Sequence, residues 1–174
     1  MKKTITVFGS AFPKEGDEEY EFAYKLGQQL ALNNFNVCTG GYYGIMEAAS
    51  KGAFENKAEV FGVTVSYFER NANNFVTTEI KCDSLFDRIA KLIELGDAYV
   101  MLKGGTGTLL ELAAVWEFTN KKLLKAKPTI CHSSMWEKII PVIDERLHYE
   151  NRKTGLIKNF NSLEEIINYL TKVI

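Results

Sequence analysis

Three short glycine-rich segments are the parts of this sequence best suited to chemistry. They are Gly9-Ser10, residues 40–44 with the sequence GGYYG, and residues 104–108 with the sequence GGTGT. Glycine lets the backbone approach a phosphate closely, and a helix that follows such a loop supplies free N–H groups and a positive dipole end. We therefore expect one anionic ligand to contact these segments and their neighbours, namely Gly9, Ser10, Gly40, Gly41, Gly44, Met46, Lys103, Gly104, Gly105, Thr106, Gly107 and Thr108.

The third segment carries the strongest indication of a phosphate site. Thr106 and Thr108 can add hydroxyl donors to the backbone N–H groups, and Lys103 brings a positive charge to the rim. Tight strand-to-helix turns explain the glycines of any single loop equally well, whereas three such strand ends together favour a ligand. The sequence has no G-x-x-x-x-G-K-[ST], and the first loop lacks G-x-G-x-x-G. The motifs favour a mononucleotide or similar phosphate over ATP hydrolysis or ordinary NAD binding.

Glu111 and Arg88 are the two charged residues that we expect at this site. Glu111 follows Thr108 by three residues, which places both on one face of the helix that the third loop opens. It is the one acid in the apolar run LLELAAV, and a buried carboxylate needs a partner such as Arg88 on the preceding helix. Two alternatives stay open, an acid that merely complements the helix dipole and an arginine that is solvated beside Asp87 and Lys91.

The predicted elements bring the three loops to one edge of a sheet. Strands are expected over residues 4–8, 35–39, 59–65, 97–102 and 128–131, and helices over residues 17–33, 45–55, 84–95, from the third loop to about 122, 135–148 and 162–172. Residues 66–81 are less regular and predict a lid or rim that ends in an extended segment at 75–80. This alternation implies a Rossmann-like α/β fold, a doubly wound parallel sheet with helices on both faces. Ligands of such sheets bind at the carboxyl ends of the strands, where the loops lie.

Length and composition are those of one ordinary globular domain, residues 1–174, with 46% hydrophobic and 25% charged residues. The formal net charge is −1 and no dense basic run occurs, which argues against a nucleic-acid partner and for a small ligand. No stretch resembles a signal peptide or reaches the ~20 apolar residues of a membrane span. We therefore expect a cytoplasmic protein without a membrane partner.

The remaining reactive residue types give weaker signals. The three cysteines lie far apart without metal-ligand spacing, so buried free thiols are expected at Cys38, Cys82 and Cys131. His132 and His148 are isolated from other ligand types, which favours surface or capping roles over catalysis. The pair Tyr42-Tyr43 suits base stacking, and suits packing beside a glycine turn equally well.

The segment KGGTGTLLE, from Lys103 to Glu111, closely resembles the P-G-G-x-G-T-x-x-E signature of the Lonely Guy family, long mislabelled as lysine decarboxylases. Gly9-Ser10 and the segment GGYYGIMEAASKGA, residues 40–53, resemble the first two glycine loops of that family. Arg88 stands nine residues before Asp97, as the family's arginine stands before its Ser-Asp-Ala strand. The resemblance covers roughly residues 4–131. Within it, Lys103 takes the place of the family's proline, Ile89 that of a lysine, and Leu110 that of a common acid.

What this resemblance implies is a Rossmann-like homodimer that needs no metal or other cofactor. The implied reaction is hydrolysis of the N-glycosidic bond of adenosine 5′-monophosphate (AMP), or of its N6-substituted cytokinin forms, to free base and ribose 5-phosphate. Residue by residue, the resemblance gives Arg88 and Glu111 the catalytic positions and residues 104–108 the phosphate cradle. A carboxylate at Glu111 can stabilise an oxocarbenium-like ribose by its charge.

Two further expectations accompany this interpretation. The Glu111 helix is more apolar than one face of a small sheet requires, which also predicts a twofold interface along it. The alternative function is a non-catalytic carrier for a phosphate-bearing cofactor, because related proteins of similar fold hold molybdenum cofactor.

Overall fold

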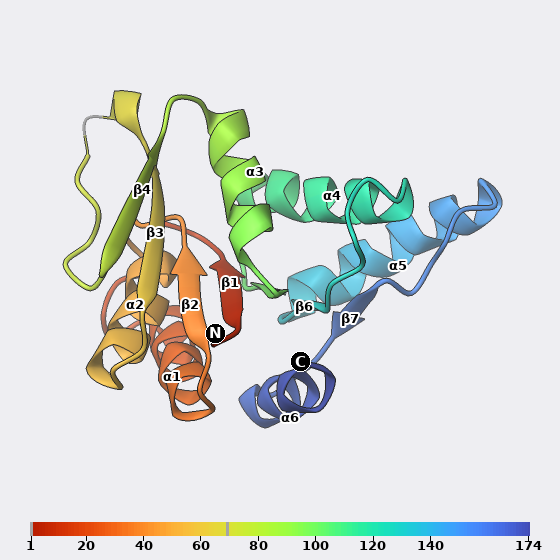
Figure 1. The fold of residues 1–174 in the computed structure, drawn as a ribbon. Helices are drawn as coiled ribbons and strands as arrows, with labels where there is room; N and C mark the ends of the chain where they lie inside the picture. The colour runs from red at the N-terminus through yellow and green to blue at the C-terminus, as the bar shows by residue number, and fades with distance from the viewer. Residues whose placement is uncertain (1, 69) are drawn as a thin grey trace.

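A seven-stranded sheet runs through the middle of the protein in a computed structural model that describes residues 2–68 and 70–174 (Figure 1). The strand order is β4-β3-β2-β1-β5-β6-β7, and every neighbouring pair is parallel. The strands are β1 (Thr4–Phe8), β2 (Asn36–Thr39), β3 (Val60–Val65), β4 (Thr78–Cys82), β5 (Ala98–Met101), β6 (Thr129–Cys131) and β7 (Ile157–Asn159). Every residue of β1 and β5 is buried, which suits central strands that are covered on both faces.

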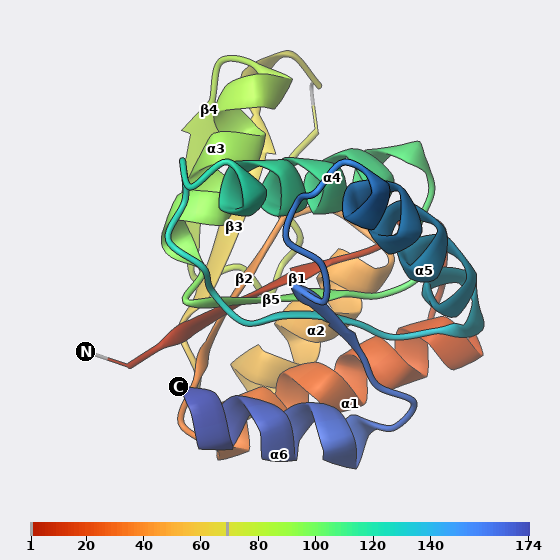
Figure 2. The same ribbon diagram turned by 90° about the vertical axis from the view of Figure 1, so that its right-hand side faces the viewer.

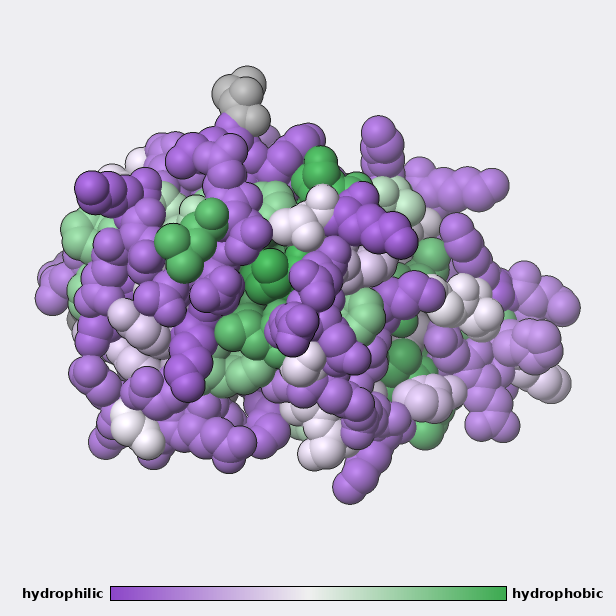
Figure 3. Space-filling view, turned by 90° about the horizontal axis from the view of Figure 1, so that it is seen from below, coloured by the Kyte–Doolittle hydropathy of each residue, from purple (hydrophilic) through white to green (hydrophobic). Residues whose placement is uncertain are grey.

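Three helices cover each face of the sheet (Figure 2). On one face lie α1 (Glu18–Leu32), α2 (Ile45–Glu55) and α6 (Leu163–Val173), whose apolar sides form one core cluster with β1 and β2. On the other lie α3 (Leu85–Leu95), α4 (Thr106–Asn120) and α5 (Ser134–Tyr149), which pack in a second cluster around Tyr99, Trp116 and Trp136. Seen from below in Figure 1, the surface is mostly hydrophilic, with hydrophobic residues gathered in small groups (Figure 3).

The topology fixes where a ligand can bind. From β1 the chain steps outward through β2, β3 and β4, then returns to place β5 on the other side of β1 and steps outward again through β6 and β7. The loops after β1 and β5 therefore leave neighbouring strands toward opposite faces, and the gap between them is the switch point where doubly wound sheets bind ligands. Gly9-Ser10 follows β1, and residues 104–108 follow β5.

The predicted Rossmann-like α/β fold is confirmed, and the edges of the sheet add detail to it. The stretch expected as a lid or rim begins with a short 3₁₀ turn, Ser66–Phe68. The extended segment expected at 75–80 is the edge strand β4, which starts three residues later and pairs with β3 over five residues. The three-residue strand β7 was not predicted at all. No helix in the described part of the chain is long and apolar enough to cross a bilayer.

Candidate functional site

Backbone hydrogen bonds tie the three glycine loops together at the carboxyl edge of the sheet. The N–H of Ser10, in the first loop, donates to the carbonyl of Lys103 just before the third loop, at 2.9 Å. The carbonyl of Ser10 accepts from the N–H of Ile45, at the start of α2, also at 2.9 Å. The loop after β1 is thus fixed between the other two.

A hollow of about 340 Å³ opens where the first and third loops face each other. Its wall combines loop backbone with two charged side chains, and it consists of Gly9, Ser10, Ala11, Phe12, Met46, Arg88, Gly105, Thr106, Gly107, Thr108 and Glu111. Nine of these residues were predicted from the sequence as site residues. Ala11 and Phe12 were not, because the sequence analysis ended the first loop at Ser10.

The third loop presents the start of a helix to this hollow. Helix α4 begins at Thr106 with Gly105 as its N-cap, and no side chain caps it. The first backbone N–H groups of a helix have no partner within the helix and, together with the helix dipole, attract anions. Gly105 and Gly107 leave open space where a side chain would stand, so an anion can approach this backbone directly. The geometry suits a phosphate group.

Arg88 and Glu111 form a buried ion pair on the wall of the hollow. Nη1 of Arg88 lies 3.6 Å from Oε1 of Glu111, and each residue is only 9% exposed. The two alternatives, a solvated arginine and an acid at an exposed helix end, do not describe these positions. Helix α3 supplies the arginine and α4 the glutamate, so the pair joins two helices of the same layer.

The guanidinium of Arg88 is fixed by two backbone carbonyls, one within β3 and one directly after β2. Its Nε donates to the carbonyl of Val63 at 2.8 Å, and its Nη2 donates to the carbonyl of Gly40 at 3.2 Å. The ring of Tyr42 lies 5.6 Å from its central carbon. A Cβ atom at Gly40 would lie 1.8 Å from Nη2, so this position must be glycine if the arginine is to stay in place. The second glycine loop therefore serves the site by holding Arg88.

Burial changes the acidity of Glu111. Loss of solvation raises the pKa of its carboxyl to about 7, and the positive charge of Arg88 opposes part of that rise. A carboxyl group with this pKa exchanges its proton near neutrality. Perturbed carboxyl groups in clefts are typical of functional sites.

The other predicted ligand contacts lie around the hollow and not on its wall. The carbonyl of Gly41 accepts hydrogen bonds from Asn73, and Gly44 lines a neighbouring hollow. Gly104 packs against the side chain of Thr108, and any side chain at this position would collide with it. These glycines shape the loops, and a direct contact with a ligand at these three positions stays a prediction.

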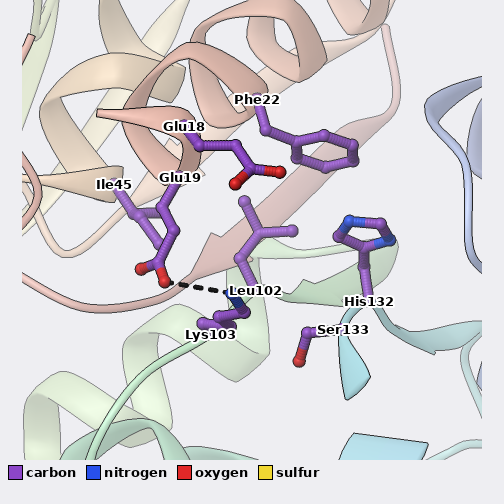
Figure 4. Close-up of a pocket in the computed structure, with 8 residues that line it drawn as sticks. All are labelled: Glu18, Glu19, Phe22, Ile45, Leu102, Lys103, His132 and Ser133. Atoms are coloured by element: carbon purple, nitrogen blue, oxygen red, sulfur yellow. Dashed lines mark ion pairs between the residues drawn. The ribbon is translucent and has the colours of Figure 1, made fainter. Parts of the chain in front are cut away.

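Lys103 lies elsewhere. Its Nζ is 3.2 Å from Oε1 of Glu19, and its side chain lines a separate small hollow together with Phe22, His132 and Ser133 (Figure 4). The side chain thus points toward Glu19 of α1. Lys103 thus meets the site through its backbone carbonyl, and its ammonium group does not line the hollow that holds Arg88 and Glu111.

The arrangement is that of a Rossmann-like α/β protein with glycine-rich loops and a buried Arg–Glu pair at the ligand end of its sheet. The chain belongs to the SLOG cluster4 family, whose family model matches residues 2–153. The sequence resemblance to the Lonely Guy family is confirmed by curated relatives.

Two relatives and one solved structure illustrate the likeness. An uncharacterized protein of Archaeoglobus fulgidus is 30% identical over 139 residues, 78% of this chain and 87% of that protein. The cytokinin riboside 5′-monophosphate phosphoribohydrolase of Rhodococcoides fascians is 30% identical over 117 residues, 65% of this chain but only 59% of that protein. The molybdenum cofactor binding protein of Rippkaea orientalis superposes with a TM-score of 0.78 over 99% of this chain and 98% of its own, at 24% identity, and shows the shared fold.

Proposed function

We propose that this protein hydrolyses the N-glycosidic bond of nucleoside 5′-monophosphates, AMP or its N6-substituted cytokinin forms, to free base and ribose 5-phosphate. The observation that carries the proposal is that the Glu111 carboxylate and the glycine loop at the start of α4 line the same hollow. A phosphate bound at the loop would bring the ribose beside Glu111, little more than one helical turn further along α4. The Rhodococcoides fascians relative is named for a reaction of this kind.

In the proposed reaction, water replaces the base at the anomeric carbon of the ribose. The carbon–nitrogen bond breaks and its electron pair leaves with the base, the water oxygen bonds to the carbon, and one proton passes from water to the departing base. Positive charge develops on the ribose in between. The ionised carboxylate of Glu111 would stabilise that charge and accept a hydrogen bond from the attacking water or a ribose hydroxyl.

Arg88 and the phosphate cradle support this step in different ways. The guanidinium favours the ionised form of Glu111, and its bonds to two backbone carbonyls keep the pair in one place. The phosphate lies away from the bond that breaks, so its binding energy serves to position the sugar. A nucleoside without phosphate is therefore expected to be a poor substrate.

We propose a homodimer whose interface includes α4. An apolar groove of about 200 Å³ lies between α4 and α5, lined mainly by side chains such as Leu109, Trp116 and Ile143. Three apolar residues of α4, Leu109, Leu110 and Phe118, are each more than 40% exposed. A second copy of this chain would cover these side chains, and a net charge of −1 opposes such pairing only weakly.

We place the proposed activity in the cytoplasm with a small nucleotide as the ligand. The three cysteines, Cys38, Cys82 and Cys131, are free and buried in the structure, as the sequence predicts, and suit a reducing compartment.

The decisive experiment is incubation of the purified protein with AMP, other nucleoside 5′-monophosphates, N6-isopentenyl-AMP and adenosine. Chromatography then measures free base and ribose 5-phosphate. We expect base from monophosphates and at least tenfold less from adenosine. The Glu111→Gln variant should bind AMP and release no base. Tight stoichiometric binding of a monophosphate by the parent protein without any base would contradict hydrolysis and favour a carrier.

A further inference from the structure

A second hollow, of about 370 Å³, adjoins the one that holds Arg88 and Glu111. Ala11 and Phe12 line both, so the loop after β1 is the shared wall between them. Gly44 allows the loop to lie this close to α2, because a Cβ there would be 2.5 Å from the carbonyl oxygen of Ser10 and Gly44 itself has a φ of 66°. A ligand that reaches past Ala11 from the first hollow enters the second.

The floor of the second hollow is polar and rich in hydrogen-bond acceptors. Glu47, in the first turn of α2, lines it, and its carboxylate has no hydrogen bond or ion pair among the described residues. Burial raises the pKa of Glu47, and Lys51 opposes the rise. The ammonium group of Lys51 is already paired with Glu15 at 2.9 Å. The free acceptor at this end is therefore the carboxylate of Glu47.

Tyr20 adds a hydroxyl group to the residues that line the same hollow. The residue is 4% exposed and lines the hollow, and the structure gives its hydroxyl no hydrogen bond among the residues it describes. The negative charge of Glu47 contributes to the raised pKa of this phenol, which places the two groups near each other. The Tyr20 hydroxyl can donate and accept, and the Glu47 carboxylate accepts, so a ligand with polar groups on its edge would complete this floor.

Aromatic side chains also line the second hollow. Phe12, which lines both hollows, is 90% exposed, and Tyr43, on the second glycine loop, is 50% exposed. Phe75 also lines the hollow and contacts the ring of Phe54, with centroids 6.0 Å apart. Exposed aromatic rings around an acceptor-rich floor match a flat heterocycle that carries N–H groups on its edge.

We infer that the second hollow is the base subsite of the proposed nucleotide site and takes a base that carries an exocyclic amino group. The base passes the shared wall, where Phe12 stacks on it, and Glu47 accepts a hydrogen bond from its amino group. The inference rests on the proposed function for the position of the phosphate and ribose. It assigns Phe12 and Glu47 to base recognition and leaves the bond cleavage to Glu111.

Binding measurements without turnover test this inference. In the Glu111→Gln background, calorimetry gives Kd for AMP, for inosine 5′-monophosphate and for ribose 5-phosphate. Inosine has a carbonyl where adenine has its amino group, so we expect AMP to bind at least tenfold more tightly than inosine 5′-monophosphate. Adding Phe12→Ala should weaken the affinity for AMP at least tenfold, because the base loses the ring on which it stacks. The affinity for ribose 5-phosphate, which has no base, should change less than twofold.

Glu47→Gln provides the sharper test, since a side-chain amide can donate to the inosine carbonyl as well as accept. We expect it to reduce the preference for AMP over inosine 5′-monophosphate at least fivefold. Glu164→Gln, which removes a first-turn acid from α6, and Tyr149→Ala, which removes another exposed ring, are the matched controls and should change nothing.

The possible outcomes separate the two proposals. If Phe12→Ala and Glu47→Gln weaken AMP and ribose 5-phosphate equally, or change neither, the base subsite is wrong. If both variants act on the base alone and the parent protein releases no base from any monophosphate, the subsite stands and the hydrolytic function fails.

Discussion

Nη1 of Arg88 lies 3.6 Å from the Glu111 carboxylate, while the other two guanidinium nitrogens donate to the carbonyls of Gly40 and Val63. The arginine is thus anchored by the backbone and the glutamate is not. Because a carboxyl with a single distant partner in a buried place holds its proton more readily, the pair is sensitive to pH near neutrality.

Activity is expected to rise with pH up to about the pKa of Glu111, which is about 7. The proposed role of Glu111 requires the ionised carboxylate, and below its pKa the proton removes that charge. We expect log kcat/KM for AMP to increase with unit slope below pH 7 and to level off above it. A profile that is flat from pH 5 to 9, or that falls as pH rises through 7, would remove the ionised Glu111 from the mechanism.

The stability of the folded protein should fall with rising pH, opposite to the activity. The folded protein keeps the Glu111 proton up to about pH 7, whereas the unfolded chain loses it near the ordinary value of 4.5. Between these values the folded state binds more protons, so the free energy of unfolding falls as pH rises, by about 3 kcal/mol in total for this group. Urea unfolding of the parent protein and of Glu111→Gln, at pH 5 and at pH 8, measures this free energy. The variant should lose less stability than the parent protein between pH 5 and pH 8.

Arg88→Ala should lower turnover of AMP at pH 7 by about 100-fold or more. Without the guanidinium the pKa of Glu111 rises further, so the activity that remains should shift to higher pH. We expect the ratio of variant to parent turnover to increase between pH 7 and 9. Arg146→Ala, which removes an exposed arginine from α5, serves as the control. Loss of thermal stability with an unchanged pH profile would assign Arg88 a structural role only.

Lys103→Ala should leave the affinity for AMP within about twofold of the parent. The sequence predicts a charge at the rim of the phosphate cradle, but the side chain is paired with Glu19 outside the hollow and is about half exposed. A pair of this kind contributes little. Affinity measured in the Glu111→Gln background checks this, and a loss of tenfold or more would return Lys103 to the phosphate site.

The proposed dimer predicts a clear effect of one charge in the groove. Leu109 lines the groove and is 42% exposed, so Leu109→Glu would place a carboxylate in the apolar interface and should give monomers at micromolar concentration. Val142→Glu, at an exposed position of α5 that does not line the groove, should remain a dimer. Sedimentation velocity distinguishes the two, and a monomeric parent protein would contradict the proposal.

The central strands and the Arg88–Glu111 pair could be predicted from the sequence because their signals are local. β1 and β5 are short runs of apolar residues that end in glycine loops, and the lone acid in LLELAAV indicates a buried carboxylate. The three-residue strand β7 carries no such pattern and is formed by pairing with β6. The direction of the Lys103 side chain and the position of Phe12 depend on how separate loops pack, which no local pattern records.

Gly40 illustrates how a residue without a functional group can decide an activity. A single methyl group there would occupy the place of the Arg88 guanidinium, so Gly40→Ala would displace Arg88 from Glu111. Such a variant would keep both ionisable partners and every atom of the phosphate loop. In a functional screen, substitutions of Gly40 should therefore lose activity as substitutions of Arg88 and Glu111 do. Gly40→Ala would inactivate the protein by the addition of one methyl group.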